Sequence, residues 1–308
     1  MSLAKPPLVA IVGPTAAGKT EVSLELAEEF HGEIVSADSR QVYRQMDIGT
    51  DKATPEQQSR VAHHLLDMAN PTERYTVAQF QQAAITAIGH IQTKGRLPFL
   101  VGGTGLYVQA VVDNLAIPAV APQSTLRAEL DGLPLEELQQ RLRAADPVGY
   151  GNIDQRNRRR LVRAIEVTET AGVPFSELKA AADSPFDTLI IGINKPWEVL
   201  EQRIEGKMTE RREHGMIDEV KRLQESGISW EQLESFGLEY RRVAEHLQGK
   251  SSYEEMVERS ARDLKAFAKR QLTWFKRDSR ISWITDENEA EGLVSDWLVK
   301  RASVRLAR

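Results

Sequence analysis

The sequence predicts an α/β fold in which helices flank a parallel sheet and a mainly helical segment is inserted. First, short apolar runs alternate with helical stretches, as they do where strands are buried on both faces. Second, a glycine-rich loop joins the first apolar run to a helix. Third, alanine, proline and arginine clusters replace the strand pattern between about residues 115 and 186.

Four apolar runs are the main predicted strands. They lie at residues 8–12, 33–37, 97–103 and 188–193. From residue 196 the chain is predicted to be mostly helical, and it closes with an edge strand over 280–285 and a charged tail. The predicted division is a core of residues 1–115 and 187–308 and a helical insertion domain of residues 116–186.

Composition excludes several classes of protein. No apolar run reaches the roughly 18 residues that span a membrane, and the N-terminal apolar segment is too short for a signal peptide. We therefore expect a cytoplasmic protein without membrane contact, monomeric by default and with no obligate protein partner. The absence of cysteine excludes disulfides, thiolate zinc sites and cysteine nucleophiles. The adjacent His63 and His64 diverge on any regular element, which favours a surface or core pair over metal ligands.

The glycine-rich loop has the pattern of a phosphate-binding loop. Gly13, Gly18, Lys19 and Thr20 match G-x-x-x-x-G-K-[ST] between a predicted strand and a predicted helix, which is typical of a P-loop NTPase-like core. Loop N–H groups surround an oxyanion, Lys19 neutralises phosphate, and the Thr20 hydroxyl suits Mg²⁺. The predicted phosphate-binding residues are Gly13, Pro14, Thr15, Ala16, Ala17, Gly18, Lys19 and Thr20. The pattern leaves open which molecule carries the phosphate.

Two other strand ends carry polar groups that we expect to face this loop. Asp38 follows the second strand, at the edge where open parallel sheets place their ligands. Such an aspartate holds Mg²⁺ or accepts a hydroxyl proton in kinases, but it can also cap a following helix. The segment "GGTGL" after the third strand brings Thr104 to the same edge, although a tight turn with an N-cap threonine looks the same.

Two basic segments stand out in a chain whose net charge is -5. The octet "RNRRRLVR", residues 156–163, contains five arginines and no acid, which favours contact with a phosphate backbone over a solvated helix face. Residues 259–280 carry eight lysines and arginines above an apolar stripe, which predicts an amphipathic helix with a basic outer face. Trp274 and Phe275 are interpreted as core residues rather than base-stacking residues.

Six blocks of sequence carry a resemblance to a known family. They are "GPTAAGKT", "SADSRQVYRQMDIGTDK", "HHLLDMANPTERYTVAQF", "GGTGLYVQA", "RRRLVRAIEV" and "FAKRQLTWF". The chain thereby resembles the bacterial tRNA dimethylallyltransferases, the tRNA isopentenyltransferase family, over about residues 8–285. The resemblance implies transfer of a dimethylallyl group from dimethylallyl diphosphate to N6 of the adenosine at tRNA position 37. Its implied partners are dimethylallyl diphosphate and the tRNA anticodon stem-loop, with Mg²⁺ as cofactor.

The resemblance also implies roles for individual residues. Asp38 is the implied general base, and Lys19 and Thr104 complete the catalytic group. The implied tRNA-binding residues are Asp38, Ser39, Arg40, Gln41, Thr104, Arg127, Arg159, Arg160 and Arg163. Because a stacked base must turn outward to reach Asp38, a channel through the protein is implied.

The chain departs from the family pattern at two places. Lys207 stands where most relatives have an arginine that contacts diphosphate, so it keeps the charge but loses the planar fork. Lys207 is the predicted diphosphate contact, either alone as a point charge or with Arg203 or Arg211 sharing the role. Residues 235–243, "SFGLEYRRV", differ from the isoleucine-glycine-tyrosine block of many relatives, which leaves the packing of the tRNA channel open.

Three functions of different classes remain. A tRNA prenyltransferase gives a role to the phosphate-binding loop, Asp38, both basic segments and the insertion, and it is favoured. A P-loop small-molecule kinase leaves the arginines without a role and must consume ATP. A non-catalytic RNA-binding module gives Asp38 no task, so Asp38→Ala would be unimpaired.

Overall fold

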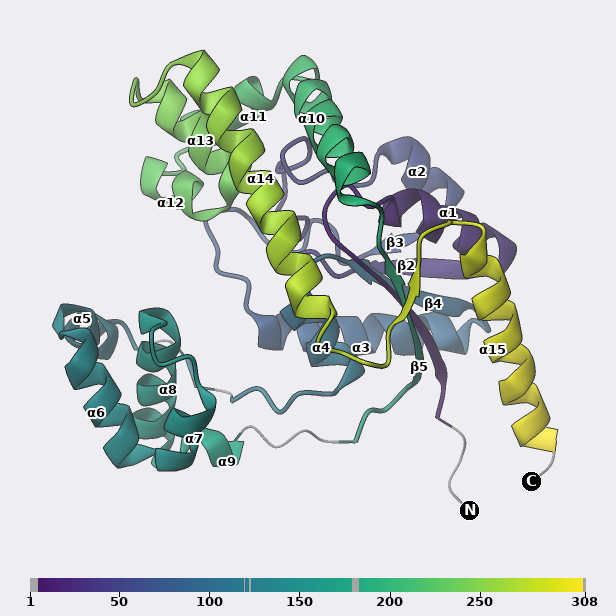
Figure 1. Ribbon diagram of the computed structural model, residues 1–308, viewed down its shortest axis with the longest axis horizontal. Helices are drawn as coiled ribbons and strands as arrows, with labels where there is room; N and C mark the ends of the chain where they lie inside the picture. The colour runs from purple at the N-terminus through teal and green to yellow at the C-terminus, as the bar shows by residue number, and fades with distance from the viewer. Residues whose placement is uncertain (1–4, 119, 122, 179–182, 307–308) are drawn as a thin grey trace. The chain divides into compact units, whose positions relative to one another are not determined.

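The computed structural model describes residues 5–118, 120–121, 123–178 and 183–306 (Figure 1). The chain divides into two compact units. The core unit comprises Met1–Val112 and Pro185–Arg308, and the insertion unit comprises Asp113–Ser184. These limits lie close to the predicted division at residues 115 and 187.

Six parallel strands form one sheet in the core unit, in the order β3-β2-β4-β1-β5-β6. The strands are β1 (Pro7–Val12), β2 (Gly32–Ser36), β3 (His63–His64), β4 (Leu97–Gly102), β5 (Asp187–Ile193) and β6 (Ser282–Ile284). The predicted parallel α/β sheet is confirmed, including an edge strand within 280–285. The sequence did not reveal β3, because a strand of two histidines has neither an apolar run nor an alternating pattern.

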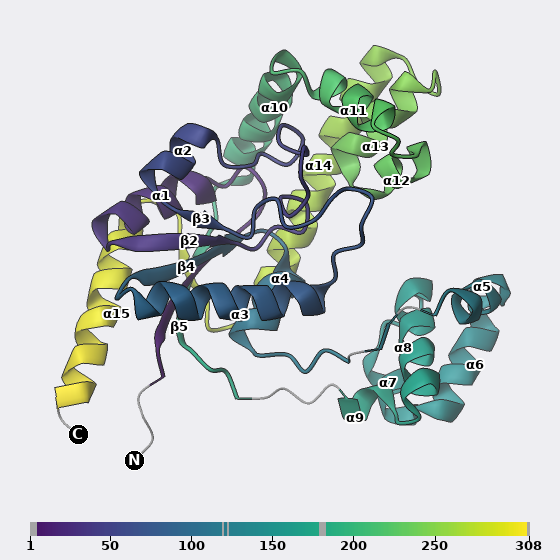
Figure 2. The ribbon, with the colours of Figure 1, turned by 180° about the vertical axis from the view of Figure 1, so that it is seen from behind.

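Helices cover both faces of this sheet (Figure 1, Figure 2). They are α1 (Lys19–Glu29), α2 (Pro55–Arg60), α3 (Val77–Thr93), α4 (Gly105–Val112), α10 (Trp197–Glu213), α11 (Met216–Glu225), α12 (Trp230–Ser235), α13 (Leu238–Leu247), α14 (Tyr253–Phe275) and α15 (Glu289–Leu306). Alternate β1 side chains enter two different cores: Leu8 and Ala10 pack in the cluster that includes α3 and α4, whereas Val9 and Ile11 pack in the cluster that includes α1 and α15. Because both faces are covered, β1 reads as a continuous apolar run.

Most of the charged tail predicted after residue 285 forms the helix α15 of the core unit, which the sequence did not predict. Its buried Ala290 and Val294 pack in the same cluster as α1, and Leu293 and Trp297 lie against them. These positions recur every three or four residues, as expected for one helix face. Charged residues lie between these apolar positions, so the sequence did not show a clear apolar helix face.

The insertion unit is helical, as predicted. Its helices are α5 (Ser124–Gly132), α6 (Leu135–Ala145), α7 (Pro147–Asn152), α8 (Arg158–Ala171) and α9 (Phe175–Leu178). Leucines of α5, α6 and α8 form a core of their own, with Leu130, Leu138, Leu142 and Leu161 fully buried. Among the residues described, neither unit contains a helix that combines the length and apolar character needed to cross a membrane.

Candidate active site

The phosphate-binding loop lies between β1 and α1, where the strands of the sheet end. Gly13 has a φ of 150°, and a Cβ atom there would lie 2.7 Å from the carbonyl oxygen of Ile193, so only glycine fits beside β5. At the other end of the loop, α1 begins at Lys19 without a side-chain cap from Gly18. The first N–H groups of a helix lack intrahelical partners, so this end of α1 offers donors to an anion.

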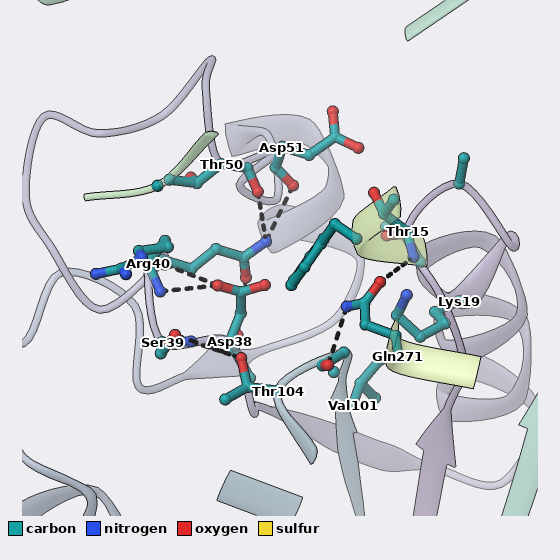
Figure 3. A pocket seen from close by; sticks show the side chains of 18 of the residues that line it. Thr15, Lys19, Asp38, Ser39, Arg40, Thr50, Asp51, Val101, Thr104 and Gln271 are labelled. Carbon is teal, nitrogen blue, oxygen red and sulfur yellow. Dashed lines mark hydrogen bonds between the residues drawn. The ribbon is translucent and has the colours of Figure 1, made fainter. Parts of the chain in front are cut away.

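Gln271 of α14 fastens this loop to the loop after β4. Its side-chain oxygen accepts a hydrogen bond from the backbone N–H of Thr15 at 2.8 Å, and its Nε2 donates to the carbonyl oxygen of Gly103 at 2.9 Å (Figure 3). The side chain is buried, so both contacts are shielded from water. Sequence reasoning missed Gln271, since its partners lie more than 160 residues away and a neutral amide leaves no charge pattern.

A cavity of about 440 Å³ opens onto the loop, and most of the predicted site residues of the core unit line it. Those residues are Thr15, Ala16, Gly18, Lys19, Thr20, Asp38, Ser39, Arg40, Gln41, Thr104 and Lys207. The predicted residues Gly13, Pro14 and Ala17 do not line the cavity, but the carbonyl oxygen of Pro14 accepts a hydrogen bond from Lys19 Nζ at 2.7 Å. The three strand-end segments singled out in the sequence therefore meet at one cavity.

Asp38 presents one carboxylate oxygen to the protein and points its side chain into the cavity (Figure 3). Oδ1 accepts hydrogen bonds from the backbone N–H groups of Arg40 at 2.8 Å and Gln41 at 3.4 Å. These contacts close a turn and cap no helix, since the next helix, α2, starts at Pro55. Among the residues that the structure describes, no hydrogen bond engages Oδ2. One oxygen of Asp38 is therefore available to a ligand.

Thr104 connects the loop after β4 to the Asp38 turn. Its Oγ1 accepts a hydrogen bond from the backbone N–H of Ser39 at 3.1 Å (Figure 3). Gln41 is used within the protein: its Oε1 accepts from the Ser36 hydroxyl at 2.8 Å, and its Nε2 donates to the carbonyl oxygens of Thr50 and Asp51 at 3.2 and 3.1 Å. Thr104 and Gln41 therefore hold the backbone on either side of Asp38.

Positive charge gathers at the phosphate-binding end of the cavity. Burial lowers the pKa of Lys19 to about 8, against the opposing charge of Asp38. Lys207 and Arg211 project from α10 into the same cavity. Arg203 does not line the cavity, although the sequence offered it as a possible diphosphate contact. It donates a hydrogen bond to the carbonyl oxygen of Ala17 at 3.4 Å.

Part of the cavity wall is apolar. Leu106 of α4 and Phe267 of α14 line it while 45% and 37% exposed, and Trp274 lies beside them, half-buried. The interpretation of Phe275 as a core residue is confirmed by its 4% exposure, whereas Trp274 both packs against the core and lines the cavity. The wall suits an apolar group or the face of a nucleobase.

The cavity offers few protein ligands for a divalent cation. The described residues contain no group of three or more histidines, aspartates or glutamates suited to holding a metal, and His63 and His64 are no exception. Thr20 does line the cavity beside Lys19. A Mg²⁺ ion often takes only one or two protein oxygens and completes its shell with water and substrate phosphates. The residues present therefore fit a Mg²⁺ ion that arrives with a phosphate ligand.

Helix α14 has the predicted amphipathic character but ends at Phe275. Leu264 and Ala268 are buried on its inner side. Part of its basic face is engaged within the core unit: Lys265 pairs with Glu205 at 2.8 Å, and Lys269 lies 4.4 Å from the ring centre of Trp197. The cations of this helix are therefore less available than their number suggests.

In the insertion unit, the predicted arginines fall into two groups. Glu166 is fully buried, and its carboxylate accepts hydrogen bonds from Arg127 at 2.7 and 2.8 Å and from Arg163 at 2.6 Å. Although burial opposes ionisation, these two cations hold the pKa of Glu166 at about 2. Arg159 and Arg160, by contrast, are exposed and form no ion pair within the described chain. The octet 156–163 contains no acid, as predicted. Glu166, three residues after Arg163, nevertheless pairs with Arg163 and Arg127.

The IPP transferase family model matches residues 41–278. The chain belongs to the IPP transferase family. Two curated relatives named tRNA dimethylallyltransferase are 44% identical over 301 residues (Roseiflexus sp. strain RS-1; 95% of this chain and 99% of the relative) and 40% identical over 298 residues (Shouchella clausii strain KSM-K16; 95% and 96%). A crystal structure of a Bacillus halodurans tRNA isopentenylpyrophosphate transferase has a TM-score of 0.74 at 36% identity, covering 98% of this chain and 99% of that chain. This IPP transferase therefore shares both sequence and fold with its relatives along nearly its whole length.

Proposed function

We propose that this IPP transferase transfers a dimethylallyl group from dimethylallyl diphosphate to N6 of the adenosine at tRNA position 37, next to the anticodon, and releases diphosphate. The observation that carries the proposal is the single cavity lined by both a phosphate-binding loop and the Asp38 carboxylate. A transfer reaction needs these two elements together, since one group must leave as an anion while another loses a proton. The names of the relatives favour this activity over a small-molecule kinase.

The loop end of the cavity would bind the diphosphate. Backbone N–H groups of Lys19 and Thr20 at the start of α1, with the side chains of Lys19 and Lys207, would face the negative charge that grows as the C–O bond of the allylic diphosphate breaks. A Mg²⁺ ion held by the Thr20 hydroxyl and diphosphate oxygens would add further charge neutralisation. The apolar wall at Leu106 and Phe267 suits the dimethylallyl group.

Asp38 would complete the reaction from the opposite side. The adenine N6 lone pair is conjugated with the ring, so the amine is a weak nucleophile and must lose a proton as the new C–N bond forms. Asp38 Oδ2 accepts no hydrogen bond from the described residues, and it would accept that proton. Thr104 would hold the turn that carries Asp38 in place, because its Oγ1 accepts a hydrogen bond from the Ser39 N–H.

The exposed arginines of the insertion unit support the anticodon stem-loop as the partner. Arg159 and Arg160 lie at the start of α8, free of acidic partners among the described residues. Guanidinium groups in that state suit phosphate oxygens of an RNA backbone. We also propose that the enzyme acts in the cytoplasm.

Replacing Arg160 with alanine should weaken tRNA binding and make it less salt-dependent, with diphosphate affinity unchanged. Removing one cation that neutralises an RNA phosphate reduces the slope of log K against log salt by about 0.7 to 0.9. The measurement is a tRNA titration at several salt concentrations, with Arg143→Ala as a control for an exposed arginine in the same unit. An unchanged slope for Arg160→Ala would remove this residue from the tRNA interface.

Replacing Gln271 with leucine should weaken diphosphate binding about tenfold. The leucine fills a similar volume but leaves the Thr15 N–H and the Gly103 carbonyl without their buried partner, which costs about 1–3 kcal/mol. Calorimetric titration with inorganic diphosphate measures the effect, and Gln271→Asn separates the effect of the amide from that of side-chain length. Equal affinity for wild type and Gln271→Leu would show that the loop keeps its shape without this side chain.

The activity itself is tested by incubating the protein with labelled dimethylallyl diphosphate and unmodified tRNA, with ATP present as a competing donor. The label should appear on N6 of adenosine 37, and ATP should remain intact. Consumption of ATP without prenylation would favour the kinase. Stable tRNA binding without transfer to any nucleotide would favour the RNA-binding module.

A further inference from the structure

Asp51 places a negative charge among the cations of the phosphate-binding end. Its Oδ2 accepts a hydrogen bond from Lys207 Nζ and lies 3.7 Å from a terminal nitrogen of Arg211. Asp51 lines the same cavity as Lys207 and Arg211. Although burial raises the pKa of Asp51, the charges of Arg211 and Lys207 outweigh it, so the pKa lies below its usual value and the carboxylate is ionised at neutral pH.

Arg211 is the second cation beside Asp51. The residue is only 8% exposed, and its guanidinium pairs with Glu239 as well as Asp51. Its Nε atom is buried and has no hydrogen-bond partner among the described residues. A buried N–H without an acceptor is unfavourable, so the surroundings of Arg211 do not satisfy all of its donors.

The backbone that carries Asp51 is held in place. The buried Glu219 accepts hydrogen bonds from the backbone N–H groups of Asp47, Ile48 and Gly49 at 2.9, 2.8 and 3.2 Å. The Tyr240 hydroxyl donates to the same carboxylate at 2.6 Å. With the loop anchored in this way, a ligand that takes the place of the Asp51 carboxylate would turn the side chain without displacing the segment.

We infer that Asp51 is a displaceable counter-ion, which occupies Lys207 and Arg211 while the cavity is free of ligand and gives them up when diphosphate binds. The inference rests on the proposed function, since it takes diphosphate as the ligand. Diphosphate and the carboxylate are both oxyanions and compete for the same two cations. Asp51 therefore lowers the affinity for diphosphate and favours its release after transfer.

The test is the affinity of Asp51→Asn for inorganic diphosphate, measured by calorimetry in the presence of a chelator. Asparagine tolerates the left-handed backbone at this position, where φ is 55°, so the loop should be retained. Removing the competing charge should tighten binding about tenfold, a change of about 1.4 kcal/mol. Lys207→Ala should then weaken binding more in the Asp51→Asn background than in the wild type, because Lys207 is no longer shared.

Asp47→Asn is the matched control. It removes the same charge from the same loop, but Asp47 pairs with Lys52, which does not line the cavity. Its diphosphate affinity should stay within about twofold of wild type. Equal or weaker binding by Asp51→Asn would overturn the inference while leaving the proposed function intact. Failure of the wild type to bind diphosphate under any condition would instead overturn the proposed function.

Discussion

Asp38→Asn should lose dimethylallyl transfer by about 100- to 10,000-fold, the range expected when a general base is removed. Asparagine keeps the size of the side chain, and its carbonyl oxygen can still accept from the N–H groups of Arg40 and Gln41. The turn should therefore survive while the proton acceptor is lost. Single-turnover transfer to tRNA measures the rate, and separate titrations should give wild-type affinities for tRNA and diphosphate.

Asp47→Asn controls for removal of a carboxylate near the same segment, since Asp47 is exposed and pairs with Lys52 at 2.6 Å. Its transfer rate should match that of wild type. Transfer by Asp38→Asn at a rate within a few fold of wild type would show that another group, or water, accepts the N6 proton.

Lys19→Met should lower the affinity for diphosphate by about a hundredfold or more, because a buried ligand charge loses its partner at a cost of about 3–5 kcal/mol. In the ligand-free protein, Lys19 has only the Pro14 carbonyl as a hydrogen-bond partner among the described residues. Calorimetry with inorganic diphosphate measures the loss, and tRNA affinity should be unchanged. A variant that still binds diphosphate as tightly as wild type would remove Lys19 from the ligand site.

The same variant should raise the stability of the ligand-free protein at neutral pH. Burial lowers the pKa of Lys19 from 10.5 to about 8, so the folded state disfavours the charged form. The unfolded chain then binds more protons than the native one between about pH 8 and 10.5, and wild-type stability gains with pH across that window. Thermal unfolding should show the largest advantage of Lys19→Met below pH 8 and a shrinking advantage up to about pH 10.5. A constant difference across this range would contradict the lowered pKa of Lys19.

The sequence predicts those parts of the fold that local patterns encode. The strands β1, β2, β4 and β5 each contain a short apolar run, and the spacing of Gly13, Gly18, Lys19 and Thr20 predicts the loop between β1 and α1. The helix α15 escaped prediction because charged residues separate its buried positions, and β3 because it consists of two histidines.

The site is less predictable, since its supporting contacts join distant segments. Gln271 reaches Thr15 across 256 positions, and Lys207 reaches Asp51 across 156. Glu219 lies in α11, whose many charged residues are typical of an exposed helix. Its side chain is nevertheless buried, with the residue 2% exposed, and it holds the loop that carries Asp51. Such roles depend on which segments the sheet brings together, and no spacing within the sequence records that.

The central claim is that Asp38 takes the N6 proton of an adenosine turned out beside diphosphate. A crystal structure of the enzyme with an anticodon stem-loop and diphosphate tests it most directly. We expect a carboxylate oxygen of Asp38 within about 3 Å of adenosine N6, with diphosphate in the loop between β1 and α1. A structure in which Asp38 faces bulk water and a different group lies beside N6 would contradict the claim.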